Sequence, residues 1–217
     1  FTHGKVRYIA YIRAALFKHF RTDNVVYHGL AGHYFLQGIS HALKIRILAD
    51  IEDRVAIVMA RDKISEKEAL HLLEKNDKAR KQWGQHLYGI DPEDPKLYDS
   101  VIHVGKMGTD GATDMICNLV SRESFRATPA SQAMVEDLAL AASVEAVLVD
   151  MELDGQDAEV TANEGKVLVK FKHPRRMHAG SFGKFHTHYL KGLKQRLQQR
   201  IHGLPDMKSL QVELKED

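Results

Sequence analysis

Residues 44–55 read KIRILADIEDRV, a strand pattern followed at once by a helix start. Residues 44–48 form a short apolar run with β-branched side chains, which is typical of a buried strand. Asp50 stands three residues before Asp53, and this spacing marks a helix start because a side-chain oxygen there satisfies a free backbone N–H. The next apolar residues recur at helical spacing, as Ile51, Val55 and Val58. The segment therefore predicts a strand that passes directly into a helix.

The same alternation continues on both sides of this segment. Two more short apolar runs predict strands, at residues 25–27 and 101–104. Periodic spacing and capping patterns predict helices at residues 9–20, 65–82 and 109–120. Strands separated by helices are typical of a mostly parallel sheet with helices on both faces, so the predicted fold class is α/β.

The alternation of predicted strands and helices changes near residue 126. Beyond this point the sequence predicts one helix, a hairpin of two strands, a second helix and a last strand. These elements are expected at residues 131–149, 159–161, 167–171, 182–201 and 210–214. The chain is therefore predicted to hold two domains, residues 1–126 and residues 127–217.

Composition excludes several classes of protein. Hydrophobic residues make up 44% of the chain and charged residues 28%, values of an ordinary globular protein and not of a disordered one. The longest apolar stretch, residues 138–149, is shorter than the roughly 20 residues that cross a bilayer. The single cysteine, Cys117, excludes an internal disulfide framework and lies in an apolar helical stripe, where a buried thiol is expected. We interpret the sequence as a trimmed cytoplasmic protein, because it starts at Phe1 and shows no signal-peptide pattern.

Charge is distributed in two blocks. Residues 129–165 hold nine acidic residues and no lysine or arginine, whereas residues 166–200 hold ten lysines and arginines and no acidic residue. The blocks are either two solvated faces of one domain or a surface for a protein partner or a second copy of the chain. A membrane surface is a less favoured partner, and no nucleic acid is expected.

Motifs for phosphate and metal binding are sparse. The pattern G-x-x-x-x-G-K-[ST], whose backbone N–H groups cradle phosphates, does not occur in this sequence. Residues 180–185 read GSFGKF, which we interpret as a helix start. The glycines at 105, 108 and 111 either form a simple loop or let a phosphate approach the backbone. His186 and His188 lie two apart on a predicted helix and point in different directions, so no metal site is expected.

Cationic residues gather on two predicted helices. Asp77 and Arg80 lie three apart on one helix face, and Arg54 and Arg61 lie seven apart on the preceding helix. They form either a cationic arm over a polyphosphate, since guanidinium groups bind phosphate oxygens bidentately, or ordinary ion pairs on exposed helices.

Several stretches together resemble the cytidylate kinase-like family. They are VVYHGLAG at 25–32, DIEDRV at 50–55, SEKEA at 65–69, DKAR at 77–80, LYGID at 87–91 and DPKLYD at 94–99 with VIH at 101–103. The resemblance covers about residues 1–121. It implies a P-loop kinase fold, a nucleoside monophosphate as phosphoryl acceptor, and ATP with Mg²⁺ as donor.

The resemblance also implies roles for individual residues. Arg80 is expected to contact phosphate with Asp77 as its orienter, as the two residues of the lid pattern D-x-x-R. The nucleotide-binding residues implied are Arg54, Arg61, Gly29 and Gly32. The family's first strand and P-loop have no counterpart in this sequence, so these residues alone are expected not to transfer phosphate. The family pattern G-R-x-G reads GLAG here, with Leu30 in place of the arginine.

Residues 127–217 resemble a BON domain in element order and in the ending GLPDMKSLQV at 203–212. BON domains bind ligands, membranes or partners and do not catalyse. The resemblances together imply a nucleotide kinase-like protein with a small α+β interaction module. The alternative hypothesis is a non-catalytic, nucleotide-responsive scaffold built on a degenerate kinase fold.

Overall fold

The computed structural model describes residues 2–151, 158–171, 182–204 and 206–214. The chain forms two compact units. We call Tyr27–Thr128 the central unit, and Phe1–Val26 with Pro129–Asp217 the terminal unit, because both ends of the chain build it. Within the described residues, no helix offers a stretch long and apolar enough to cross a bilayer.

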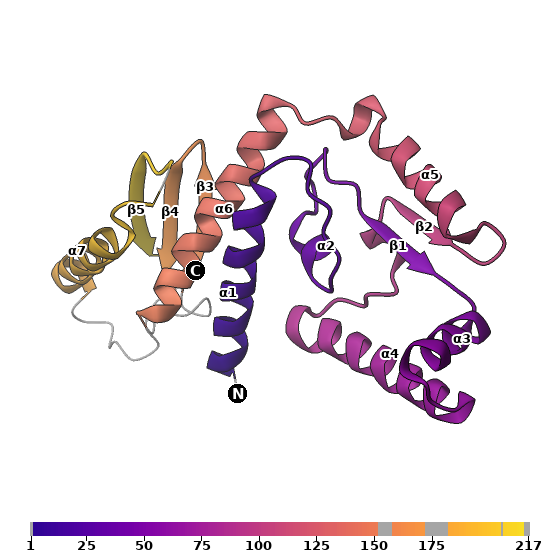
Figure 1. Ribbon diagram of the computed structural model, residues 1–217. Helices are drawn as coiled ribbons and strands as arrows, with labels where there is room; N and C mark the ends of the chain where they lie inside the picture. The colour runs from indigo at the N-terminus through magenta and orange to yellow at the C-terminus, as the bar shows by residue number, and fades with distance from the viewer. Residues whose placement is uncertain (1, 152–157, 172–181, 205, 215–217) are drawn as a thin grey trace. The chain divides into compact units, whose positions relative to one another are not determined.

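The central unit holds a two-stranded parallel sheet and its helices (Figure 1). Strands β1 (Ile45–Leu48) and β2 (Ser100–His103) pair with Ile45 opposite Ser100 and Leu48 opposite His103. The helices are α2 (Gly32–Phe35), α3 (Ile51–Asp62), α4 (Glu66–Tyr88) and α5 (Gly108–Val120). Short 3₁₀ turns occupy Pro95–Leu97 and Glu123–Phe125. The parallel sheet with flanking helices confirms the α/β class.

Helices α3 and α4 form a pair joined by a short connection, with their own small core. Val55 and Val58 of α3 pack with Ala69 and Leu73 of α4. The capping box predicted at the start of α4 is confirmed, because Ser65 and Glu68 exchange side-chain and backbone hydrogen bonds. Helix α4 ends later than predicted, at Tyr88, and the φ of +70° at Gly89 suits a left-handed C-cap.

Three local predictions for residues 1–126 are wrong. Residues 25–27 form no strand, and Val26 is 98% exposed, because β-branched residues make a strand only where a neighbouring strand pairs with them. The Asp50 side chain makes no capping hydrogen bond, since it pairs with His103 instead. Cys117 is exposed, because α5 buries only Ala112 fully and covers Ile116 and Leu119 in part, while the thiol lies outside this contact.

The terminal unit carries a three-stranded sheet in the order β3-β4-β5. Its elements are α1 (Thr2–Phe20), α6 (Pro129–Asp150), β3 (Ala158–Asn163), β4 (Lys166–Phe171), α7 (Phe182–Ile201) and β5 (Ser209–Leu214). Strands β3 and β4 are antiparallel, and β4 and β5 are parallel, so α7 makes the crossover. From α6 onward the order helix–strand–strand–helix–strand agrees with the prediction.

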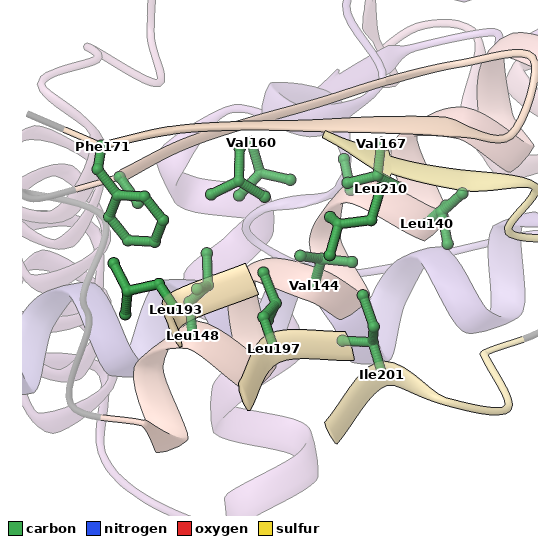
Figure 2. Close-up of a cluster of buried hydrophobic side chains, with 13 residues drawn as sticks. Leu140, Val144, Leu148, Val160, Val167, Phe171, Leu193, Leu197, Ile201 and Leu210 are labelled. Atoms are coloured by element: carbon green, nitrogen blue, oxygen red, sulfur yellow. The ribbon is translucent and has the colours of Figure 1, made fainter. Parts of the chain in front are cut away.

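Aliphatic side chains fill the space between this sheet and helices α6 and α7 (Figure 2). Val167 of β4 points toward Val144 of α6 and Leu197 of α7, and Val169 of the same strand belongs to this buried cluster. The hairpin turn consists of Glu164 and Gly165, both with positive φ, and Asp137 of α6 accepts hydrogen bonds from both of their backbone N–H groups. A Cβ on Gly165 would lie 2.5 Å from the Asp206 carbonyl oxygen, so only glycine fits there.

Helix α1 packs on α6 and therefore belongs to the terminal unit, although we predicted it as part of a domain over residues 1–126. The two helices run antiparallel, as their polar contacts show. Arg13 bonds Glu145, the Tyr11 hydroxyl donates to Asp150, and Gln132 donates to the Arg21 carbonyl. The compact units thus divide the chain at residues 26/27 and 128/129, and only the second of these boundaries lies near the predicted one.

Replacing Phe17 of α1 tests how strongly α1 supports the terminal unit. Phe17 is fully buried, so we expect Phe17→Ala to lower the free energy of unfolding by about 3–5 kcal/mol through lost burial and a residual cavity. Urea denaturation and hydrogen exchange of α6 peptides measure the effect. Tyr8→Ala on the same helix is the control, because that side chain is 49% exposed, and it should change stability by less than about 1 kcal/mol. Equal effects of the two variants would show that α1 is not part of this core.

Candidate functional site

The carboxyl ends of β1 and β2 meet at one edge of the parallel sheet in the central unit, where ligands of open α/β sheets bind. Asp50 lies two residues after the end of β1, and His103 is the last residue of β2. The His103 Nε2 atom lies 3.3 Å from Asp50 Oδ1, and both side chains are largely exposed. A Cβ on Gly105 would lie 3.0 Å from the His103 ring, so this glycine gives the pair room. Local sequence patterns did not indicate the pair, because its members lie about fifty residues apart and only the strand register joins them.

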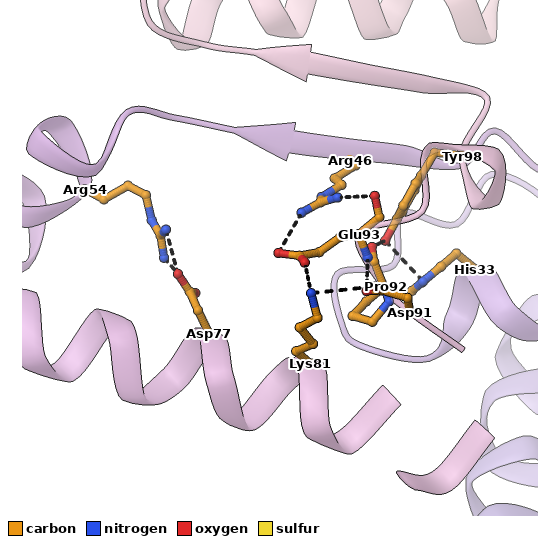
Figure 3. A network of polar contacts seen from close by, with 9 residues as sticks. All are labelled: His33, Arg46, Arg54, Asp77, Lys81, Asp91, Pro92, Glu93 and Tyr98. Atoms are coloured by element: carbon orange, nitrogen blue, oxygen red, sulfur yellow. Dashed lines mark hydrogen bonds and ion pairs between the residues drawn. The ribbon is translucent and has the colours of Figure 1, made fainter. Parts of the chain in front are cut away.

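Arg54, in the first turn of α3, is held by α4. Its Nη1 and Nη2 atoms each donate a 2.8 Å hydrogen bond to a separate oxygen of Asp77 (Figure 3). This bond raises the pKa of the Arg54 guanidinium, with the charge of Asp77 adding to it. The fork geometry fixes the plane of the guanidinium and joins the two helices.

Asp77 thus orients Arg54, and the predicted role of Asp77 as orienter of Arg80 is wrong. No hydrogen bond or ion pair among the described residues joins Asp77 to Arg80, which is exposed on α4. Arg61 is also exposed and binds the neighbouring Asp62, whose carboxylate raises the pKa of its guanidinium. Of the three predicted arginines, Arg54 is therefore held in place by Asp77. Arg61 and Arg80 lie on the surface of the same helix pair.

The segment Asp91–Tyr98 is fastened to the central unit from three sides (Figure 3). Lys81 of α4 forms ion pairs with Asp91 and Glu93. Arg46 of β1 donates a 2.9 Å hydrogen bond to the Glu93 carbonyl. Asp99, next along the chain, accepts a 2.7 Å hydrogen bond from the backbone N–H of Lys44 and so aligns the starts of the two strands.

The third attachment is made by aromatic residues of α2. The His33 ring stacks on Tyr98 with ring centroids 4.9 Å apart. The Tyr98 hydroxyl donates a 2.8 Å hydrogen bond to the Pro92 carbonyl, so its oxygen accepts at 3.3 Å from His33 Nε2. Burial lowers the pKa of His33 to about 4 and raises the pKa of the adjacent Tyr34 to about 12. His33 is therefore neutral at pH 7, with the proton on Nε2.

The glycines of the GLAG segment differ in their surroundings. Gly32 is buried and begins α2, whereas Gly29 is exposed. A Cβ on Gly29 would collide with the Tyr27 ring, so the tyrosine closes over this glycine. Leu30 is 42% exposed and presents an apolar side chain at the position where the pattern G-R-x-G has an arginine.

Metal ligands do not gather in the described part of the chain, where no group of three or more His, Cys, Asp and Glu side chains could hold an ion. The prediction for His186 and His188 concerns side chains outside the described residues. Gly108 begins α5 with a φ of +72°, which favours glycine, and the loop before it carries the exposed Lys106.

The buried state of His33 makes stability depend on pH. The unfolded chain takes up a proton near pH 6.5 and the folded chain only near pH 4, so stability rises with pH between these values and is complete above pH 6.5. After allowance for partial exposure, we expect about 2 kcal/mol from this group. His33→Phe keeps the ring stack and removes the titration. We compare the free energies of unfolding of the two proteins in urea from pH 4.5 to pH 7.5. The difference between them should rise with pH up to about 6.5, and a difference that does not change with pH would contradict this expectation.

Gly84 of α4 tests the contact between α4 and the Asp91–Tyr98 segment. A Cβ there would lie 2.9 Å from the Tyr34 hydroxyl and 3.2 Å from Pro92 Cδ. We expect Gly84→Ala to destabilise the protein by about 1–3 kcal/mol through overpacking, despite the better helix propensity of alanine. Gly192→Ala in α7 is the matched control, since nothing lies within 4 Å of its Cβ, and it should stabilise by about 0.5–1 kcal/mol. Thermal unfolding measures the stability of both variants. If both substitutions stabilise the protein, the Asp91–Tyr98 segment moves aside to make room for the added methyl group.

Comparison with known proteins identifies relatives of one part of the chain. Residues 4–106 match the Cytidylate kinase-like family, which confirms the resemblance inferred from the motifs over that range. The cytidylate kinase of Thermococcus kodakarensis is 34% identical over 88 residues, 41% of this chain and 45% of the relative. The cytidylate kinase of Sulfolobus acidocaldarius is 28% identical over 103 residues, 48% of this chain and 56% of the relative.

A third cytidylate kinase, from Thermoplasma acidophilum, is 33% identical over 104 residues, 47% of this chain and 55% of the relative. The chain thus spans about half the length of the curated relatives it matches. A crystal structure of an uncharacterized protein from Eubacterium ventriosum shares 36% identity, with a TM-score of 0.35 over 37% of this chain and 45% of that chain.

Proposed function

We propose that the central unit is the acceptor and lid part of a nucleoside monophosphate kinase of the cytidylate kinase-like type, acting on ATP and a nucleoside monophosphate in the intact protein. The observation that carries the proposal is the Arg54–Asp77 fork at the start of α3, next to the carboxyl edge of the β1–β2 sheet. Phosphoryl transfer requires positioning and charge neutralisation more than covalent chemistry, and a fixed guanidinium supplies both.

The three arginines divide this work. Arg54 is held rigid by Asp77, so it is preorganised to meet phosphate oxygens at the edge of the sheet. Arg61 and Arg80 lie exposed on α3 and α4, and as lid residues they would close onto the phosphates from solvent. Asp50 and His103 lie at the same edge, where they would bound the site of the reacting groups.

The side chains of this site suit ATP better than they suit a protein-bound Mg²⁺ ion. The cationic side chains suit a polyphosphate, which favours ATP as the donor. The described residues hold no carboxylate cluster for a metal, so Mg²⁺ would be supplied bound to the phosphates. Asp50 is the carboxylate of this edge and could orient such an ion through water. All of the chemistry that these residues themselves perform is binding and orientation.

One observation favours the alternative of a nucleotide-responsive scaffold that does not catalyse. Leu30 is exposed in the GLAG segment, and Tyr27 lies against Gly29, so this segment offers no cation to an acceptor phosphate. A scaffold needs nucleotide binding alone. Turnover of ATP by the intact protein would exclude this alternative.

For residues 127–217 we propose an interaction module of the BON type. Its support is the order of helices and strands and the β3-β4-β5 sheet. Lys191, Arg196 and Arg200 are exposed on α7, whereas Lys194 is partly covered, so α7 offers a positive surface to a protein partner or to a second copy. Salt would weaken such an association, since charges are screened over about 10 Å at 0.1 M.

Arg80→Ala tests the lid role of the exposed arginine. A charge-assisted hydrogen bond to phosphate is worth about 1.5–3 kcal/mol, so we expect ATP affinity to fall about 10- to 100-fold. Isothermal titration with ATP and with CMP, dCMP, UMP and AMP measures the change. Lys75→Ala is the matched control, because Lys75 is exposed on the same helix five residues away and faces a different direction. Unchanged nucleotide affinity in Arg80→Ala would make Arg80 a surface residue and remove it from the proposed lid.

A further inference from the structure

A cavity of about 550 Å³ lies within the terminal unit, between α1, α6 and the edge strand β3. Its volume is in the range of small-molecule sites, roughly 300–1,000 Å³. The walls are mostly aliphatic, with Ile9 of α1, Leu148 of α6 and Val160 of β3 among them. The proposed nucleotide site does not use this cavity, which belongs to the other unit.

One end of the cavity is polar. Arg13 of α1 donates from Nη1 to both carboxylate oxygens of Glu145 on α6, at 2.8 and 2.6 Å. The side chains are only 25% and 23% exposed, so the ion pair is largely removed from water. Along α1 the lining runs from Val6 to Arg13, a rise of roughly 10 Å at about 1.5 Å per residue. The cavity is thus an elongated apolar space with a charged pair at one end.

The two members of this pair are not equivalent toward a ligand. Arginine does not lose its proton in proteins, whereas a carboxylate can be protonated. Burial raises the pKa of Glu145, and the nearby Arg13 charge opposes that shift only in part. The pair can therefore open in one direction, in which Glu145 takes up a proton and Arg13 binds a different anion. A cationic ligand would have to displace Arg13 and leave a charged guanidinium without its counterion.

The other charged groups at the cavity do not alter this preference. Strand β3 contributes Glu159 and strand β4 contributes Lys170, and these two residues stand opposite each other in the strand register. Their charges offset each other. The next polar contact between α1 and α6, where Arg7 and Tyr11 meet Asp150, involves none of the residues that line the cavity. Among the described lining residues, α7 contributes none.

We propose that this cavity binds a medium-chain alkyl carboxylate, whose carboxylate takes the place of Glu145 at Arg13 while its alkyl chain lies along the aliphatic walls. Glu145 takes one proton from solvent in the exchange, so charge inside the cavity is conserved. The ligand carboxylate gains the Arg13 hydrogen bonds that Glu145 gives up, and the apolar surface of its chain leaves water.

Isothermal titration of the complete 217-residue chain with octanoate tests the proposal. We expect octanoate to bind with uptake of close to one proton, seen by comparing two buffers that differ in heat of ionisation. Affinity should fall as pH rises above the pKa of Glu145, by up to about tenfold per pH unit. Octylamine and octanol, which share the alkyl chain and lack the carboxylate, should bind at least about tenfold more weakly.

Glu145→Gln separates the proposed exchange from simple apolar binding. Glutamine mimics the protonated carboxyl group, so the variant should bind octanoate without proton uptake and with little dependence on pH. Glu164→Gln, in the exposed hairpin turn, is the matched control and should keep the behaviour of the unchanged chain.

Three results would each overturn the proposal. These are no octanoate binding at millimolar concentration, octylamine binding more tightly than octanoate, and octanoate binding without proton uptake by the unchanged chain. The last measurement needs no variant, so the test stands even where Glu145→Gln fails to fold.

Discussion

Helix α6 has two buried faces, and the terminal unit is arranged around this constraint. Leu140, Val144 and Leu148 face the sheet and α7. Val135, Ala139, Ala142 and Val149 are also buried, and at 3.6 residues per turn they lie on the opposite side of the helix. A three-stranded sheet covers only one side of such a helix, so the second side needs another element. Helix α1 is that element, and the small alanines allow it to approach closely.

Because of this packing, α1 belongs to one part of the chain by sequence and to another part in space. In sequence it lies within the segment that matches the Cytidylate kinase-like family, residues 4–106. In space it completes the core of the terminal unit, where Phe17 is fully buried. Residues 129–217 therefore do not make up a compact unit by themselves, because a helix from the other end of the chain belongs to the same unit. The cavity with Arg13 and Glu145 exists only because of this arrangement.

In the central unit, the Asp91–Tyr98 segment has a comparable organising role. It carries no regular strand, yet it receives Lys81 from α4, Arg46 from β1 and His33 from α2. Asp99 then fixes the start of β1 against the start of β2, and the Asp50–His103 pair lies at their other ends. The motif residues in the stretch from 91 to 99 thus act mainly on the fold.

Local patterns in the sequence determined most elements, because caps, turns and periodic apolar faces act over a few residues. The capping box at Ser65, the Glu164–Gly165 turn and helix 182–201 are of this kind. The same patterns misplaced residues 25–27 and Cys117, since strand pairing and burial need partners that lie far along the chain. For the site, the sequence singled out Arg54 and Asp77 but not their mutual bond, nor the Asp50–His103 pair. Only the tertiary structure joined these residues and moved α1 to the terminal unit, because contacts between distant segments depend on which apolar faces must be covered.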